Sequence, residues 1–206
     1  MNKYLSMMGC VAMACCCATA SADQFQDTDA SFMNGDVFVP LITETDTDSD
    51  GVPDKLTMRY NVFVAGTNTK TLSTKPRTVA YPAIPCTNPA SVTDGYYERL
   101  TGLAGKSRRH SILDMHISCV ENGSGAEKEA HRAVLYSANV TGAGGSWIKS
   151  WNGWGVTGAA HVDWDSDSVP EIMLLLQKGN KGRVLFVRMS DGTIEADNIY
   201  TVAVSK

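Results

Sequence analysis

Hydrophobic residues recur along this chain in short runs that polar and turn-forming residues separate. Gly, Asn, Asp, Ser, Thr or Pro borders each run, which is typical of strands that end in turns. No segment keeps a helical period for long, although residues 124–135 have room for one helical turn before a strand. Asp191 and Gly192, between two runs, predict a hairpin turn. The pattern therefore predicts an all-β domain, with strands in residues 36–42, 55–64, 111–120, 132–140, 171–177, 182–189 and 198–205.

The N-terminal segment has a different pattern. A lysine at position 3 is followed by an apolar run and then by small residues that end at Ala22. This order is typical of a secretory signal peptide over residues 1–22, with cleavage after Ala22. The run is shorter than the roughly 20 apolar residues of a transmembrane helix, and no later stretch reaches that length. We therefore expect no transmembrane segment and a periplasmic or secreted protein of the bacterial export type.

Two alternatives remain open for this segment. It could be an ordinary buried N-terminal helix. It could also be a lipoprotein signal, because Ala12 to Cys15 partly matches the small residues that precede a lipidated cysteine, although the usual leucine is missing. In that case the chain would carry a lipid anchor at Cys15.

Removal of residues 1–22 would leave 184 of the 206 residues, enough for one domain with a hydrophobic core. Residues 23–35 are polar and predict a flexible N-terminal lead, so that a single all-β repeat domain spans residues 36–206. Loss of Lys3 leaves 17 basic and 22 acidic residues, a formal net charge of −5. This acidity argues against nucleic acid and against anionic membranes as partners.

Two of the six cysteines, Cys86 and Cys119, lie outside the predicted signal peptide. An even number of cysteines in an oxidising compartment predicts one disulfide. The alternative is a pair of buried thiols. Neither cysteine lies in a C-x-x-C motif or beside an evident base, so a catalytic thiol is not expected.

The stretch DTDSDGVPD places carboxylates at alternate positions of a glycine-containing loop. Ca²⁺ takes about six to eight oxygen ligands, and alternate carboxylates on a tightly curled loop can all point inward. A glycine at the sixth position permits the left-handed conformation that such a curl needs. The alternative is an acidic surface turn. The expected Ca²⁺ ligands of this first loop are Asp46, Asp48, Asp50, the Val52 carbonyl and Asp54.

A second loop, DWDSDSVPE, repeats the pattern 117 residues later. Two departures are expected to leave it weak or empty. Ser168 replaces the glycine, so a residue with a Cβ must take a positive φ at a cost on the order of 1 kcal/mol. Glu171 replaces an aspartate and adds a methylene to a tight cage. The expected ligands are Asp163, Asp165, Asp167, the Val169 carbonyl and Glu171.

The two loops, with the strand that follows each, resemble the FG-GAP or VCBS-type repeats of β-propellers, including those of integrin alpha chains. The resemblance covers residues 36–65 and 147–195, with a degenerate copy between them that carries basic residues in place of acids. It implies about three antiparallel blade-like repeats, fewer than the four to eight blades that close a propeller. A partial propeller is therefore expected. The alternatives are a β-sandwich-like domain that carries the loop and a four-blade ring of shorter repeats.

Aromatic residues and histidines give weaker signals. Four tryptophans fall between residues 147 and 164, and we expect them to pack in the core, with stacking on sugar rings as the alternative. The four histidines, at positions 110, 116, 131 and 161, have no metal-ligand spacing and are expected to be ordinary structural histidines.

The expected function is that of an exported, non-enzymatic binding or adhesion module with a structural Ca²⁺ and a protein or glycan partner. No nucleophile, phosphate-loop or zinc signature is present in the sequence. One rival function is a periplasmic enzyme, or an accessory domain of one, with acids such as Asp94 or Asp114 in a cleft. Two acids or histidines that converge in a concave pocket would favour the enzyme. The other rival is a purely structural envelope protein with one thrombospondin-type acidic repeat.

Overall fold

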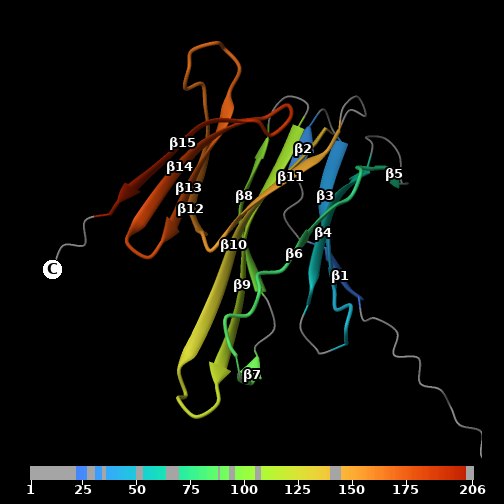
Figure 1. Ribbon diagram of the computed structural model, residues 1–206. Helices are drawn as coiled ribbons and strands as arrows, with labels where there is room; N and C mark the ends of the chain where they lie inside the picture. Colours follow the sequence, from blue (N-terminus) through green and yellow to red (C-terminus); the bar gives the residue numbers. More distant parts are fainter. Residues whose placement is uncertain are drawn as a thin grey trace, which may run out of the picture.

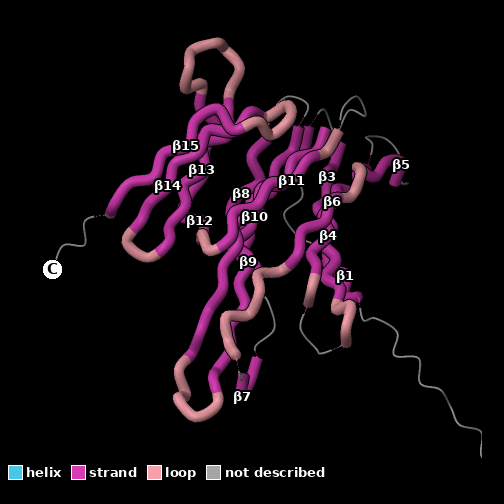
Figure 2. Tube along the Cα trace, in the orientation of Figure 1, coloured by secondary structure: helices cyan, strands magenta, loops and turns pink. Residues whose placement is uncertain are grey.

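The computed structural model describes residues 22–26, 31–33, 36–49, 53–63, 70–87, 89–92, 96–104, 108–139 and 145–202. Within these residues the chain is all-β, without a helix, as the sequence predicts (Figure 2). Accordingly, the described part holds no helix with the length and apolar character needed to span a membrane. The strands form three antiparallel sheets, named here in chain order the first, second and third sheet (Figure 1).

The first sheet contains β1 (Ala22–Gln26), β2 (Ser31–Met33), β3 (Asp36–Thr45), β4 (Lys55–Phe63), β5 (Lys70–Ser73) and β6 (Arg77–Ala80). The second contains β7 (Pro89–Val92), β8 (Tyr96–Ala104), β9 (Arg108–Glu121), β10 (Glu127–Asn139) and β11 (Trp147–Asn152). The third contains β12 (Gly155–Val162), β13 (Glu171–Lys178), β14 (Lys181–Arg188) and β15 (Ile194–Thr201), which pair in sequence order.

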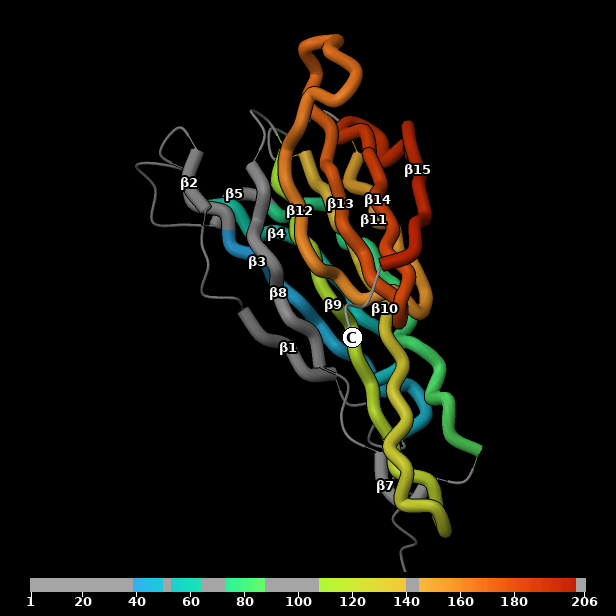
Figure 3. The backbone as a smooth tube through the Cα atoms, turned by 90° about the vertical axis from the view of Figure 1, so that its left-hand side faces the viewer, coloured from blue at the N-terminus to red at the C-terminus, as the bar shows by residue number. Residues whose placement is uncertain are grey.

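The second sheet lies between the other two, so most of β9 and the second half of β10 are buried on both faces (Figure 1 and Figure 3). Successive side chains of a strand point to opposite faces of its sheet. Leu113 and Met115 of β9 accordingly pack into one core with residues of the first sheet. Ile112 of β9 and Leu135 of β10 pack into a second core with residues of β13 and β14. This arrangement explains why β9 and β10 read as nearly continuous apolar runs.

The described sheets stack in a row and do not close on themselves, because the first and third sheets lie on opposite sides of the second (Figure 1). The expectation of three antiparallel sheets is confirmed at this level. The second and third sheets both contain four-stranded meanders, β8 to β11 and β12 to β15. The first strands of the two meanders, β8 and β12, both run towards the top of Figure 1.

The hairpin of β3 and β4 runs in the opposite sense. Its loop lies at one end of the stack, whereas the loop between β12 and β13 lies at the other end, at the top of Figure 1 (Figure 1 and Figure 3). The two acidic loops therefore do not share one face of the molecule, which a ring of equivalent blades would require.

Local predictions have mixed outcomes. The helical turn predicted in residues 124–135 is wrong, because β10 begins at Glu127 and pairs with β9 along its length. The hairpin turn at Asp191 and Gly192 is confirmed, with Gly192 at φ 77° and its N–H donating to the Arg188 carbonyl at 2.9 Å. Residues 23–35, predicted to be a flexible lead, contain most of β1 and all of β2, and both strands pair with β3.

Cys86 and Cys119 form a disulfide, as the sequence predicts. Cys119 is buried in β9 of the second sheet, whereas Cys86 lies in the connection that follows β6 of the first sheet. The bond therefore ties a strand-free connection to the central sheet.

Candidate functional site

The first acidic loop joins β3 to β4 and brings three of its predicted ligands together. Carboxylate oxygens of Asp46, Asp48 and Asp54 all lie within 4.8 Å of one another. Thr47 donates to Asp54 Oδ2 from its hydroxyl and, at 2.5 Å, from its backbone N–H. These hydrogen bonds hold the pKa of Asp54 below its ordinary value, so its carboxylate stays ionised. The other two predicted ligands, Asp50 and Val52, lie outside the described residues.

The second acidic loop joins β12 to β13 and groups the equivalent positions. Oxygens of Asp163, Asp165 and Glu171 lie within 4.8 Å of one another. Asp167 is not in this group, and its Oδ1 instead accepts the Val169 N–H at 2.7 Å. In both loops, the carboxylates at positions one, three and nine thus converge. The carboxylate at position five of the second loop instead accepts a backbone hydrogen bond within the turn.

The two loops also share a backbone feature. Ser49 and Ser166 occupy the fourth position of their loops, and each has a φ of 65°. Ser168, at the sixth position of the second loop, has a φ of 70°, which confirms the strained conformation predicted for the serine that replaces glycine. Such values are uncommon for residues with a Cβ and indicate that the loop contacts hold these serines in place.

Glu171 is the most buried of the described acids in the two loops, with 1% of its surface exposed. Its Oε2 accepts the Trp164 N–H at 3.3 Å. Burial raises the pKa of Glu171 above its ordinary value of 4.5, and the neighbouring Glu195, Asp165 and Asp167 raise it further. A buried carboxylate surrounded by other acids is unfavourable without a positive partner, which a bound cation would supply.

We expect Glu171→Gln to stabilise the metal-free protein at neutral pH. Because the folded pKa is raised, the folded state binds this proton more tightly than the unfolded state. Its contribution to the free energy of unfolding is therefore present below pH 4.5 and falls as the pH rises through the folded pKa. Urea unfolding in EDTA between pH 4 and pH 8 measures this slope, with the exposed Glu127→Gln as control. An equal slope in wild type and Glu171→Gln would contradict the assignment.

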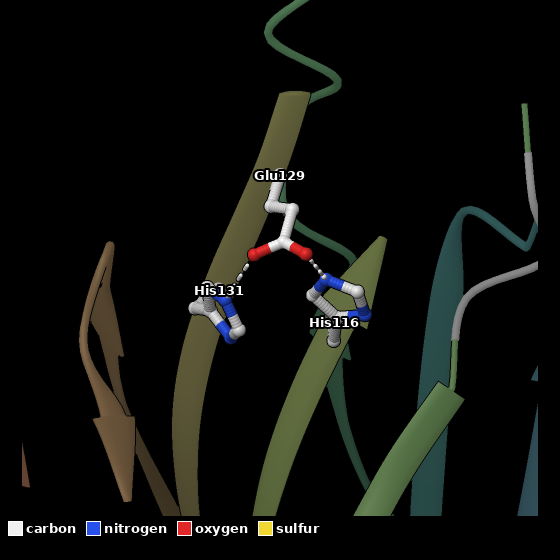
Figure 4. A group of neighbouring side chains, drawn as sticks. All are labelled: His116, Glu129 and His131. Carbon is white, nitrogen blue, oxygen red and sulfur yellow. Dashed lines mark hydrogen bonds and ion pairs between the residues drawn. The ribbon is translucent and has the colours of Figure 1, made fainter. Parts of the chain in front are cut away.

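A third cluster, which the sequence did not predict, lies on β9 and β10. His116 of β9 and His131 of β10 are register partners, and their ring centroids are 4.6 Å apart. Glu129 lies between them, with Oε1 3.5 Å from His116 Nε2 and Oε2 3.4 Å from His131 Nε2 (Figure 4). Asp114 Oδ1 lies 3.6 Å from His131 Nδ1. Burial raises the pKa of Asp114, while His131 and His116 oppose this shift.

This cluster borders a pocket of about 780 Å³ between the second sheet and one end of the third. Asp114, Glu129 and His131 line one side of the pocket, and Gly155 and Lys178 line the other. Two acids and a histidine therefore converge in a concave site, which includes one of the two acids named from the sequence. The other, Asp94, lies outside the described residues.

The remaining histidines and the tryptophans have structural surroundings. His110 is fully buried, and neither ring nitrogen has a hydrogen-bond partner among the described residues. Burial and the neighbouring His161 lower its pKa to about 3, so it is neutral. Trp151 and Trp154 lie in the core as expected, but Trp164 is 42% exposed and stacks on Phe186 at 4.9 Å.

Comparison with known proteins adds no relative: no family model, no curated protein sequence and no solved structure matches this chain. The geometry of the three clusters is therefore the evidence for a functional site. Two of them were found from alternating acids in sequence. The third could not be found in this way, because its residues meet only through the register of β9 and β10.

Proposed function

We propose that this chain is an exported, non-enzymatic binding module whose acidic loops each bind a structural Ca²⁺. One observation carries the proposal: the same three positions of both loops bring carboxylates within 4.8 Å of one another. Hard oxygen donors in this number suit Ca²⁺, which can complete its shell with backbone carbonyls and water. Buried Glu171 adds a second reason, because a cation would offset the cost of its buried charge.

The proposal includes a relationship to FG-GAP or VCBS-type blades. The antiparallel meanders of the second and third sheets, and the strand-flanked second loop, support it. The loop of the first sheet lies at the other end of the stack, so we propose that the two ions stiffen opposite ends of the domain (Figure 1). A second loop flanked by strands also counts against a purely structural envelope protein with one acidic repeat.

The third sheet is the proposed binding surface. Within the described part of the chain, the large hydrophobic side chains that are exposed all belong to this sheet and its loops. They are Trp164, Val169, Ile194, Ile199 and Tyr200. Exposed apolar and aromatic side chains are typical of sites that contact a protein or a glycan.

A glycan array and a panel of secreted and surface proteins, probed with the mature chain in Ca²⁺, test the binding function. We expect a saturable partner and a loss of about 2 kcal/mol or more, roughly 30-fold in affinity, for Trp164→Ala. Glu127→Ala, an exposed change at the far hairpin, is the control and should bind normally. A partner whose affinity is the same for Trp164→Ala and wild type would contradict this surface.

The pocket beside Asp114, Glu129 and His131 favours a second candidate function, that of an enzyme. A carboxylate and an imidazole in one cleft can exchange protons with a substrate. Any turnover by this pocket should be lost in Asp114→Asn and kept in Trp164→Ala. Turnover that is kept in Asp114→Asn and lost in Trp164→Ala would contradict catalysis in this pocket and favour the binding module.

A further inference from the structure

We propose that His116, Glu129 and His131 bind one divalent transition-metal ion, with zinc as the best match, at the mouth of the pocket. This site is separate from the acidic loops and does not depend on them. Two imidazoles and one carboxylate are the ligand types that Zn²⁺ prefers, and three protein ligands leave one coordination position open.

The distances are close to those of a bound metal. When each bond is about 2.0–2.1 Å long, two ligand atoms of a tetrahedral Zn²⁺ lie about 3.3 Å apart. Glu129 Oε1 lies 3.5 Å from His116 Nε2, and Glu129 Oε2 lies 3.4 Å from His131 Nε2. One ligand atom from each of the three residues lies within 4.8 Å of the other two. Figure 4 shows the carboxylate reaching from β10 towards both rings. Small side-chain rotations would therefore complete the ligand set.

The fold holds two of the three ligands in place. His116 and His131 are directly paired across two central strands, and the side chain of His116 is only 9% exposed. A ligand pair on neighbouring strands of a packed sheet needs little ordering when the metal binds. Glu129, at 52% exposure, is the adjustable ligand.

Asp114 supplies the partner that a metal-bound histidine commonly has. Its Oδ1 faces His131 Nδ1 at 3.6 Å, and both atoms are buried without a hydrogen-bond partner among the described residues. A small rotation would bring the two atoms to hydrogen-bond distance and place the ring proton on Nδ1. Nε2, the atom that faces Glu129, would then be free to bind metal. We therefore assign Asp114 as a positioning residue and not as a ligand.

The open coordination position would face the pocket. Glu129 and His131 line the pocket, whereas His116 is more deeply buried behind them. A water molecule on the ion would therefore be accessible from the side of Lys178 and Gly155. The chemical class of ligand is thus a transition-metal ion with one exchangeable water, a different class from the Ca²⁺ proposed for the acidic loops.

Isothermal titration of Zn²⁺ into the untagged, EDTA-treated mature chain tests this site. Excess Ca²⁺ in the buffer occupies the acidic loops, so that Zn²⁺ binding there does not contribute. We expect one Zn²⁺ per chain and about a 10–100-fold loss of affinity for Asp114→Asn. His131→Gln and Glu129→Gln, which remove ligands, should lose more.

Two controls make the result decisive. Glu127→Gln on the same strand and His161→Gln in the third sheet lie outside the cluster and should bind Zn²⁺ like the wild type. Glu129 is exposed, so Glu129→Gln should fold normally, which its circular dichroism checks. No saturable Zn²⁺ binding by the wild type, or wild-type affinity in folded Glu129→Gln, would overturn the proposal.

Discussion

Removal of Ca²⁺ should lower the melting temperature of residues 23–206, the chain without the predicted signal peptide, by about 5–10 °C for each occupied loop. An ion that binds only the folded loop adds about 2.7 kcal/mol at 100 times its dissociation constant. For a domain of this size, 1 kcal/mol corresponds to about 2–4 °C. The sequence favours the first loop as the stronger site. Melting curves in Ca²⁺ and in EDTA measure the shift, and Mg²⁺ should replace Ca²⁺ poorly because it demands octahedral geometry.

Two matched variants locate the effect. Asp48→Asn removes a carboxylate from the group in the first loop and should abolish the part of the Ca²⁺-dependent shift that this loop contributes. Asp167→Asn changes an acid that bonds the Val169 N–H and stands outside the group, so it should change the shift little. A wild-type melting curve that chelation leaves unmoved, or a larger effect from Asp167→Asn, would contradict the assignment.

Loss of the Cys86–Cys119 disulfide should destabilise the chain by roughly 3–4 kcal/mol. The bond closes a loop with a sequence separation of 33, and opening it frees the unfolded chain to adopt more conformations. It also releases the connection after β6 from the central sheet. Urea unfolding with and without reductant measures the difference.

Cys86→Ala is the cleaner variant, because Cys86 is only partly buried, whereas Cys119 is 1% exposed. Reductant should destabilise the wild type and leave Cys86→Ala unchanged. Equal stability of the oxidised wild type and Cys86→Ala would mean that the connection is held by its other contacts.

The strands were predictable because the buried residues of most strands form short apolar runs in the sequence. The runs at 111–120 and 132–140 became β9 and β10, and Gly192 marked a turn whose positive φ favours glycine. The start of β10 was not predictable in this way. Residues 127–131 are polar apart from Ala130, and they are exposed or half-buried, so that pairing with β9, and not an apolar pattern, makes them a strand.

The acidic loops were predictable because their ligands are neighbours in sequence. The histidine cluster was not, because His116 and His131 meet only when β9 and β10 pair in one register. The sequence also did not predict that the two acidic loops lie at opposite ends of the stack. Equal spacing of acids says nothing about the direction in which each hairpin enters the stack.

The central position of the second sheet has a consequence for how the chain assembles. The sheets follow one another in chain order, so a chain that emerges N-terminus first can cover one face of β9 and β10 early. The opposite face, with Ile112 and Leu135, stays uncovered until β13 and β14 have been synthesised. Until those strands arrive, an apolar sheet face is open to proteases and to self-association.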